Sequence, residues 1–92
     1  MKQRERDVER TFTRLGKSKG ALVLKLTCPG TSGVPDRLVI HANGQVDFVE
    51  LKAPGEKPRR LQLETFRKFE QRGHVVDVID NKEDAERWWK GR

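Results

Sequence analysis

The amino-acid sequence predicts an α/β fold in which a mixed β-sheet, built around a central hairpin, is flanked by helices. Apolar residues near the start of the chain recur at helical spacing. Two β-rich runs meet at an Asn-Gly pair, which is a typical hairpin turn. A helical segment and one further β-rich run follow, and this order predicts a parallel crossover. The 92 residues are expected to form a single domain, residues 1–92.

The first helix is predicted over residues 3–16. Its apolar side chains are spaced by four and by three positions, which places them on one helical face. Glu5 lies one turn earlier on that face. We expect the helix to end at Gly16 and a basic loop, residues 17–19, to follow. The apolar side chains of this face are Val8, Phe12 and Leu15.

Residues 21–28 are apolar and β-rich, so they predict a strand. Cys28 ends this run, and we expect it to pack as a strand residue rather than to act as a nucleophile. Residues 29–35, PGTSGVP, have the composition of turns throughout. They separate the strand from the hairpin that follows.

Residues 36–52 predict this hairpin, with Asn43-Gly44 at its tip. Its register depends on the length of the loop, because a slip of one residue turns the whole face of a strand over. A loop of two residues would pair Ala42 with Gln45. In that register the acidic residues at the two strand ends would point to opposite faces.

A loop of three residues is the register we prefer. It makes Gly44 left-handed, pairs His41 with Gln45 and places Asp36 opposite Glu50. It also gives both strands one continuous apolar face, with the charged residues at its end. The apolar residues of that face are Leu38, Ile40, Val46 and Phe48.

A loop rich in Pro, Gly and basic residues, 53–60, leads into a helix predicted over 60–72. Gly73 is expected to end this helix, and residues 74–79 predict the last strand. The buried side of the helix is expected to carry Gln62, Phe66 and Phe69.

A final helix is predicted to begin after Asp80 or Asn81, either of which can cap it, and to run through Trp88 and Trp89. Two consecutive tryptophans are not expected to face one core. We therefore expect one of them to pack and the other to meet a subunit interface or a base.

The formal net charge of +6 and the pI of about 9.9 indicate a polyanionic partner, and nucleic acid is the usual one. Two basic residues, Lys25 and Arg37, lie on predicted strands, and most other candidates lie in loops or turns. For each residue, plain solvated surface is the alternative. The candidate phosphate contacts are Lys17, Lys19, Ser32, Arg37, Lys57, Arg59 and Arg60.

A single cysteine cannot form an intrachain disulfide, which indicates a reducing setting. No run approaches the roughly 20 apolar residues of a membrane span. The first ten residues are too charged for a secretory signal. We therefore expect a cytoplasmic protein.

The residues whose side chains could form an active site are Asp36, Glu50 and Lys52. Two carboxylates on adjacent strands offer the oxygen ligands that Mg²⁺ prefers, and the Leu51 carbonyl could add a third. Lys52 could orient or deprotonate an attacking water, or stabilise charge on a phosphate. A structural ion pair between Lys52 and Glu50 is the alternative, and the pattern alone leaves both open.

Three segments in this order, TSGVPDRLV, FVELKAPG and RRLQLETF, resemble the virus-type replication-repair nuclease (VRR-NUC) family of the PD-(D/E)xK superfamily. The likeness covers about Glu5 to Asp80 and implies a restriction-endonuclease-like core. It implies a metal site formed by Asp36, Glu50 and the carbonyl of Leu51. The catalytic residues that it implies are Glu5, Asp36, Glu50, Lys52 and Gln62, with Glu9 as a weaker alternative to Glu5.

The resemblance also implies hydrolysis of DNA phosphodiester bonds with Mg²⁺, for which Mn²⁺ can substitute. Stand-alone members resemble Holliday-junction resolvases, so we expect a homodimer that cuts branched DNA in recombination, replication or repair. No small-molecule substrate is implied. A flap or nicking nuclease subunit and a non-catalytic DNA-binding module remain alternatives. A phage source, with action in the host cell, is also open.

Overall fold

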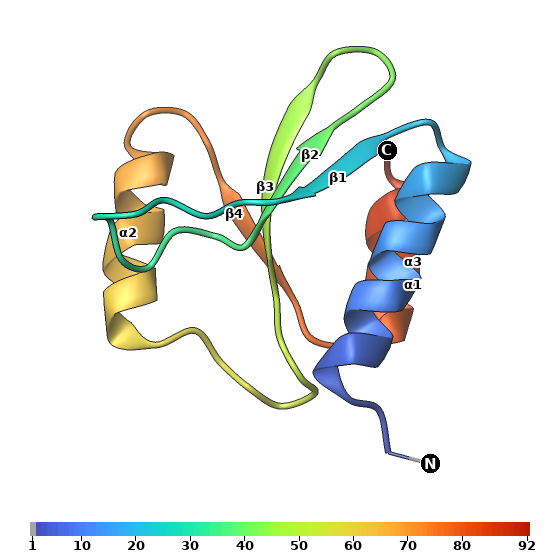
Figure 1. Cartoon of the computed structure of the whole chain (residues 1–92), viewed down its shortest axis with the longest axis horizontal. Coiled ribbons are helices and arrows are strands. Elements are labelled where there is room, and N and C mark those ends of the chain that lie inside the picture. The colour runs from blue at the N-terminus through green and yellow to red at the C-terminus, as the bar shows by residue number, and fades with distance from the viewer. Residues whose placement is uncertain (1) are drawn as a thin grey trace.

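The computed structural model describes residues 2–92 and shows a four-stranded sheet between helices (Figure 1). Helices α1 and α3 lie together against one face of the sheet, and α2 lies on the other side. None of the helices in these residues is long and apolar enough to cross a membrane. In chain order the elements are α1 (Glu5–Ser18), β1 (Leu22–Lys25), β2 (Arg37–Ile40), β3 (Val46–Leu51), α2 (Arg60–Glu70), β4 (Val76–Ile79) and α3 (Lys82–Lys90).

The sheet has the strand order β1-β2-β3-β4. The β1/β2 and β2/β3 pairs are antiparallel, whereas β3 and β4 are parallel. Helix α2 connects the parallel pair, which confirms the predicted crossover. Gly73 follows the end of α2 with a φ of +89°, a left-handed conformation that glycine adopts without strain. The predicted fold class is therefore confirmed.

The hairpin has the predicted three-residue loop. Ile40 pairs with Val46, and the backbone N–H of His41 donates to the carbonyl of Gln45 at 2.8 Å. Gly44 has a φ of +90° and its N–H donates to the His41 carbonyl at 2.9 Å. Because the register is continuous along both strands, Asp36, which precedes β2, lies opposite Glu50 of β3.

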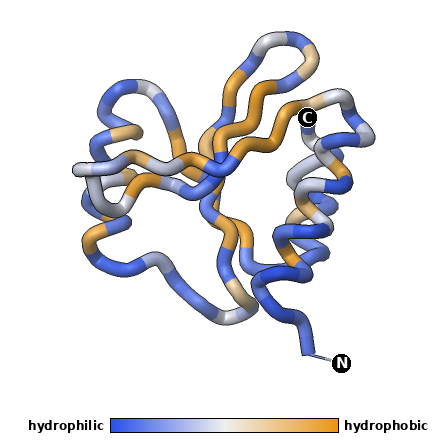
Figure 2. Tube along the Cα trace, viewed as in Figure 1, coloured by the Kyte–Doolittle hydropathy of each residue, from blue (hydrophilic) through white to orange (hydrophobic). Residues whose placement is uncertain are grey.

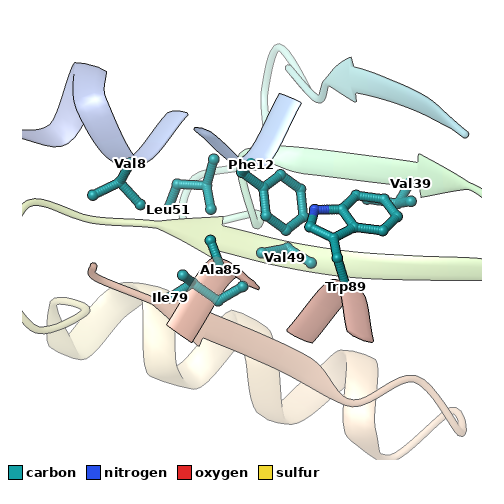
Figure 3. Packing of buried hydrophobic residues seen from close by; sticks show 8 residues of the cluster. All are labelled: Val8, Phe12, Val39, Val49, Leu51, Ile79, Ala85 and Trp89. Atoms are coloured by element: carbon teal, nitrogen blue, oxygen red, sulfur yellow. The ribbon is translucent and has the colours of Figure 1, made fainter. Parts of the chain in front are cut away.

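The main hydrophobic core lies between the sheet and the pair α1/α3 (Figure 3). Phe12 packs its ring against Trp89 with centroids 5.1 Å apart, and both side chains are almost fully buried. The predicted apolar face of the first helix is confirmed, since Val8 and Phe12 are fully buried and Leu15 packs against them. The core consists of Val8, Phe12, Val39, Val49, Leu51, Ile79, Ala85 and Trp89.

The apolar hairpin face predicted from the sequence is the second face, and it is only partly covered. Phe48 packs edge-on against Phe69 of α2, with ring centroids 4.9 Å apart. On the same face Leu22 is 58% exposed, Leu24 42% and Val46 44%. Figure 2 shows hydrophobic residues along the strands themselves. Alternation alone could not identify the deeper core, because both faces of the hairpin are apolar.

Helix α1 extends to Ser18, two residues beyond its predicted end. Gly16 does not end the helix but lies buried within it. A Cβ at this position would lie 2.6 Å from Val23 Cγ2 and 2.7 Å from Trp89 Cζ2. The glycine is therefore required for close packing of α1, and the predicted basic loop is instead the last turn of α1 and the turn after it.

Strand β1 is shorter than predicted, because it ends at Lys25. Cys28 lies beyond it and is exposed, so the expectation of a packed strand residue is wrong. One further backbone bond, from the N–H of Leu26 to the carbonyl of Asp36 at 2.9 Å, continues the pairing. After it the chain enters the turn-rich segment that contains Pro29.

Both tryptophans of α3 pack against the core, contrary to prediction. The two rings meet edge to face at 86°, which lets Trp88 pack beside the buried Trp89. Trp88 Nε1 donates to Asp77 Oδ2 at 2.9 Å, and the Arg92 guanidinium lies 4.0 Å from the Trp88 ring centroid. Trp88 is therefore partly buried against the core, beside the fully buried Trp89. Asn81 caps α3 as predicted, accepting from the N–H of Asp84.

Candidate active site

Four of the predicted site residues meet at one end of the sheet. Asp36 directly precedes β2, Glu50 lies near the end of β3, and Lys52 directly follows β3. Gln62 reaches the same place from the first turn of α2. The backbone N–H of Lys52 donates to the carbonyl of Ile79 at 2.9 Å, so β4 holds this end of β3 in place.

Glu50 is the centre of this cluster. Its side chain is only 4% exposed, and both oxygens accept hydrogen bonds. Oε1 accepts from the backbone N–H of Asp36 at 3.1 Å. Oε2 accepts from Gln62 Nε2 at 2.9 Å and lies 3.1 Å from Lys52 Nζ. These donors offset the cost of burying the carboxylate.

The side chain of Asp36, just before β2, accepts a hydrogen bond that a backbone carbonyl would accept within a sheet. Its Oδ1 accepts from the backbone N–H of Leu51 at 3.1 Å. Burial, and next the charge of Glu50, raise the pKa of Asp36 to about 6, although the Leu51 bond and Arg37 act in the opposite direction. The two carboxylates are therefore close enough for the charge of Glu50 to disfavour the ionised form of Asp36.

Gln62 links α2 to Glu50 of β3 and to Lys52. Its Oε1 accepts from Lys52 Nζ at 3.1 Å and from the backbone N–H of Arg59 at 2.8 Å. The second bond satisfies a free N–H at the start of α2, as the third residue of a helix commonly does. One side chain thus starts the helix and fixes the lysine. The capping role was missed in the sequence, although a glutamine three residues after the N-cap position is a signal for it.

The turn before Asp36 is packed tightly against α2. Gly33 has a φ of +82°, and a Cβ there would lie 2.9 Å from the carbonyl oxygen of Leu61. Thr65 Oγ1 donates to the carbonyl of Ser32 at 2.9 Å. These contacts explain the glycine in the GVPD segment, because only glycine permits both the backbone conformation and the close approach.

Glu5 and Glu9 both border the site from α1. Partial burial raises the pKa of Glu5, as do the carboxylates of Glu9 and Glu56, while Lys52 lowers it. Glu9 forms an ion pair with Arg37 at 3.3 Å, and its charge also acts on Asp36. The helical face of Val8 favoured Glu5 over Glu9, whereas the structure brings both to the edge of the cluster.

Arg37 requires a correction as a candidate phosphate contact. Its side chain is only 6% exposed and lies between two carboxylates, 3.3 Å from Glu9 and 3.7 Å from Asp36. The guanidinium also donates to the Asp36 carbonyl at 3.1 Å. Burial and these partners leave little of the guanidinium exposed to an external phosphate, so the structure does not favour this prediction.

The other predicted phosphate contacts lie in three places. Ser32 and Arg59 line one open pocket beside the site, together with Lys52 and Gln62 of the cluster, and Lys57 lies exposed in the loop that leads to it. Lys19 lies at the other end of α1, where its Nζ donates to the carbonyl of Arg92 at 3.4 Å. Two further candidates are exposed on helices, Lys17 at the end of α1 and Arg60, which pairs with Glu64 on α2.

The donor set suits a hard divalent cation. Asp36 and Glu50 supply carboxylate oxygens, and Asp36 Oδ2 accepts no hydrogen bond from residues 2–92. The Leu51 amide faces Asp36, and the carbonyl of a strand residue points to the same side as its amide. Within that part of the chain no three His, Cys, Asp or Glu side chains form a ready cage, so waters would complete the shell, as Mg²⁺ prefers.

Comparison with known proteins agrees with this geometry. No model of a known protein family matches the sequence. A protein named "Putative nuclease p44", from Acyrthosiphon pisum secondary endosymbiont phage 1, is 41% identical over 80 residues, which are 87% of this chain and 86% of that protein. A solved structure described as a VRR_NUC domain matches with a TM-score of 0.86 and 33% identity, over 94% of each chain. The chain therefore belongs to the VRR-NUC family, within the PD-(D/E)xK superfamily.

Proposed function

We propose that the protein is a metal-dependent endonuclease that hydrolyses DNA phosphodiester bonds, with Mg²⁺ as cofactor and Mn²⁺ as a substitute. The observation that carries the proposal is the position of Lys52. Its ammonium lies 3.1 Å from Glu50 and donates to Gln62, and Lys52 lines an open pocket. A lysine that served only to neutralise Glu50 would not need a second partner beside that pocket.

Each residue of the cluster has a distinct role in this proposal. Asp36, Glu50 and the Leu51 carbonyl would hold the cation, which supplies Lewis-acid polarisation of the scissile phosphate. Lys52 donates hydrogen bonds to the attacking water or to the phosphate oxygens, where negative charge develops. Gln62 keeps the lysine pointed at that charge, and it also occupies one oxygen of Glu50. Glu5, at the edge of the site, accepts a hydrogen bond from a water near the cation.

We further propose that the protein works as a homodimer on branched DNA. The uncovered sheet face supports a self-association surface, because Leu22, Leu24 and Val46 are 42–58% exposed on a domain with little core to spare. A two-fold pair would bring two active sites to two strands of one junction. Light scattering coupled to size exclusion tests this step, and a monomer at all concentrations would leave the flap or nicking alternative.

The test of the catalytic proposal uses labelled four-way junction, flap, nicked and linear duplex DNA with Mg²⁺, Mn²⁺ or EDTA. Wild type is compared with Lys52→Ala and Asp36→Asn. We expect metal-dependent cutting that falls at least about a hundredfold in both variants, a typical effect of losing a transition-state donor or a metal ligand. Lys90→Ala, which removes an exposed lysine from the far helix α3, is the control and should cut like wild type.

The outcomes separate the possible functions. Paired symmetric nicks in the junction support the dimeric resolvase, whereas single cuts at a flap or a nick support the alternative specificity. Binding without cutting under every metal condition would contradict the enzyme proposal and leave a DNA-binding module.

A further inference from the structure

Helix α1 carries a row of basic residues on the side away from the core. Arg6, Arg10 and Arg14 follow one another at a spacing of four, and Lys17 continues the row. All four are exposed. Together with Lys25 of β1 they line one groove between α1 and the edge of the sheet, and we call these five residues the α1 basic groove. Of the five, only Lys17 was predicted as a phosphate contact.

The cations of this groove are not neutralised by the protein itself. None of the five forms an ion pair within residues 2–92. The one carboxylate that lines the groove, Glu9, is paired with the buried Arg37 at 3.3 Å. Elsewhere in the same part of the chain, Arg60, Arg87 and Arg92 all have acidic partners. The groove therefore concentrates positive charge that an external anion can neutralise.

We propose that the α1 basic groove binds the phosphate backbone of a DNA duplex arm next to the cut site. The proposal rests on the proposed function, because it names how the same substrate is held. The eleven-residue step from Arg6 to Lys17 spans about 17 Å at 1.5 Å per residue. At 3.4 Å per base pair this equals the rise of about five base pairs. A linear row of this length suits a backbone better than a single small anion.

The composition of the groove identifies the kind of contact. Its lining contains no aromatic residue, so it offers no platform on which the bases of a single strand could stack. Long cationic side chains and one threonine, Thr13, suit phosphate oxygens and carry no sequence information. These features favour a duplex recognised by its backbone over a single strand or a specific base sequence.

The groove also leads to the active site. Glu9 and Arg37 line it, and Arg37 Nη1 lies 3.7 Å from Asp36 Oδ1. A duplex that follows α1 is thereby directed to the sheet end that holds the carboxylates (Figure 1). The predicted loop contacts Lys57 and Arg59 lie on the α2 side of that end, so the two basic regions would contact the substrate on opposite sides of the cut.

The test compares Arg10→Gln with Arg14→Gln as a double variant against Arg67→Gln with Arg72→Gln. Both pairs remove two exposed arginines, and glutamine keeps the helix propensity of arginine. Binding of a labelled duplex is measured by fluorescence anisotropy in EDTA, so that no cutting occurs, over salt from about 50 to 200 mM. Circular dichroism and thermal unfolding verify that both proteins are folded like wild type.

We expect the α1 double variant to lower the slope of log K against log salt by about 2, near 0.9 for each lost phosphate contact. At about 0.1 M salt this corresponds to a loss of roughly 10- to 100-fold in affinity. The control pair should lose less than about threefold. Equal losses in the two pairs would overturn the inference, as would a single strand of equal length that binds as tightly as the duplex.

The same proteins distinguish this inference from the proposed function. A wild type that cuts DNA while the α1 variant cuts and binds like the control overturns the groove alone. A wild type that binds through the groove but never cuts with any metal overturns the nuclease alone. A wild type that neither binds the duplex nor cuts any of the DNA substrates with any metal overturns both.

Discussion

The two faces of the sheet differ in how deeply their apolar side chains are buried. On the face toward α1 and α3, Val39, Val49 and Leu51 are at most 1% exposed. On the face toward α2, apolar residues of β1 and β3 remain 42–58% exposed, and the charged cluster lies at its end. The first face supplies most of the stability. The second face holds the charged cluster at one end, beside an open pocket that Lys52 and Gln62 line.

The sharpest way to break this contrast is a pair of truncations to alanine, one on each face. Phe12→Ala removes a fully buried ring and should lower the free energy of unfolding by about 3–5 kcal/mol, enough to unfold much of so small a domain. Leu24→Ala on the open face should cost less than about 1 kcal/mol in the monomer, since much of the side chain already meets water. Urea unfolding measures both, and similar losses would show that the open face is covered in solution.

The next effect concerns Gln62, the side chain that joins α2 to Glu50 and Lys52. Gln62→Ala removes the cap of α2 and a donor to Glu50, so it should cost about 2 kcal/mol of stability. We also expect at least about a tenfold loss of cleavage at temperatures where the variant is folded, because Lys52 loses its tether. Glu64→Ala, two residues further along the same helix, should change neither quantity, since its ion pair is exposed. Normal cleavage by folded Gln62→Ala would contradict the positioning role.

The smallest effect is a pH dependence of the metal-free protein. The folded-state pKa of Asp36 is raised from 3.8 to about 6, so protonation favours the folded state. The stability that Asp36 contributes is therefore complete below about pH 4 and is lost as the pH rises through about 6. The side chain is 33% exposed, so we expect on the order of 1 kcal/mol rather than the full shift.

Asp36→Asn removes this dependence. In EDTA the variant should unfold at a higher temperature than wild type above about pH 7, and the difference should vanish near pH 4. Added Mg²⁺ should stabilise wild type and leave the variant unchanged. If the melting temperature of wild type changed with neither pH nor Mg²⁺, the unfavourable interaction between the two carboxylates would be contradicted.

The sequence predicted what depends on neighbours along the chain. The register of the hairpin follows from a short turn and from alternation, so Asp36 and Glu50 were placed correctly before any tertiary contact was known. The sequence did not show which face of the sheet is more deeply buried, because this depends on which face α1 and α3 pack against. The Glu9–Arg37 pair joins a helix to a strand across 28 positions of the chain, and no local pattern indicates it.

Other differences had signals that were open to two interpretations. A glycine such as Gly16 can either end a helix or allow close packing within one. Only the contacts with Val23 and Trp89 show that Gly16 serves close packing. The row that begins with Arg6 was present as a spacing of four in the sequence. Charge on a helix is usually solvated surface, and the sequence does not show that Lys25, on a strand, lines the same groove.

The acidic pair also completes the sheet where the strands separate. The N–H of Leu51 is held by the Asp36 carboxylate and the N–H of Asp36 by the Glu50 carboxylate, in places where a neighbouring strand would normally supply a carbonyl. Alanine at either position would thus remove a hydrogen bond of the fold together with the carboxylate. Amide-for-acid replacements keep an accepting oxygen at both places, so they separate chemistry from architecture in any experiment that needs a dead enzyme of unchanged shape.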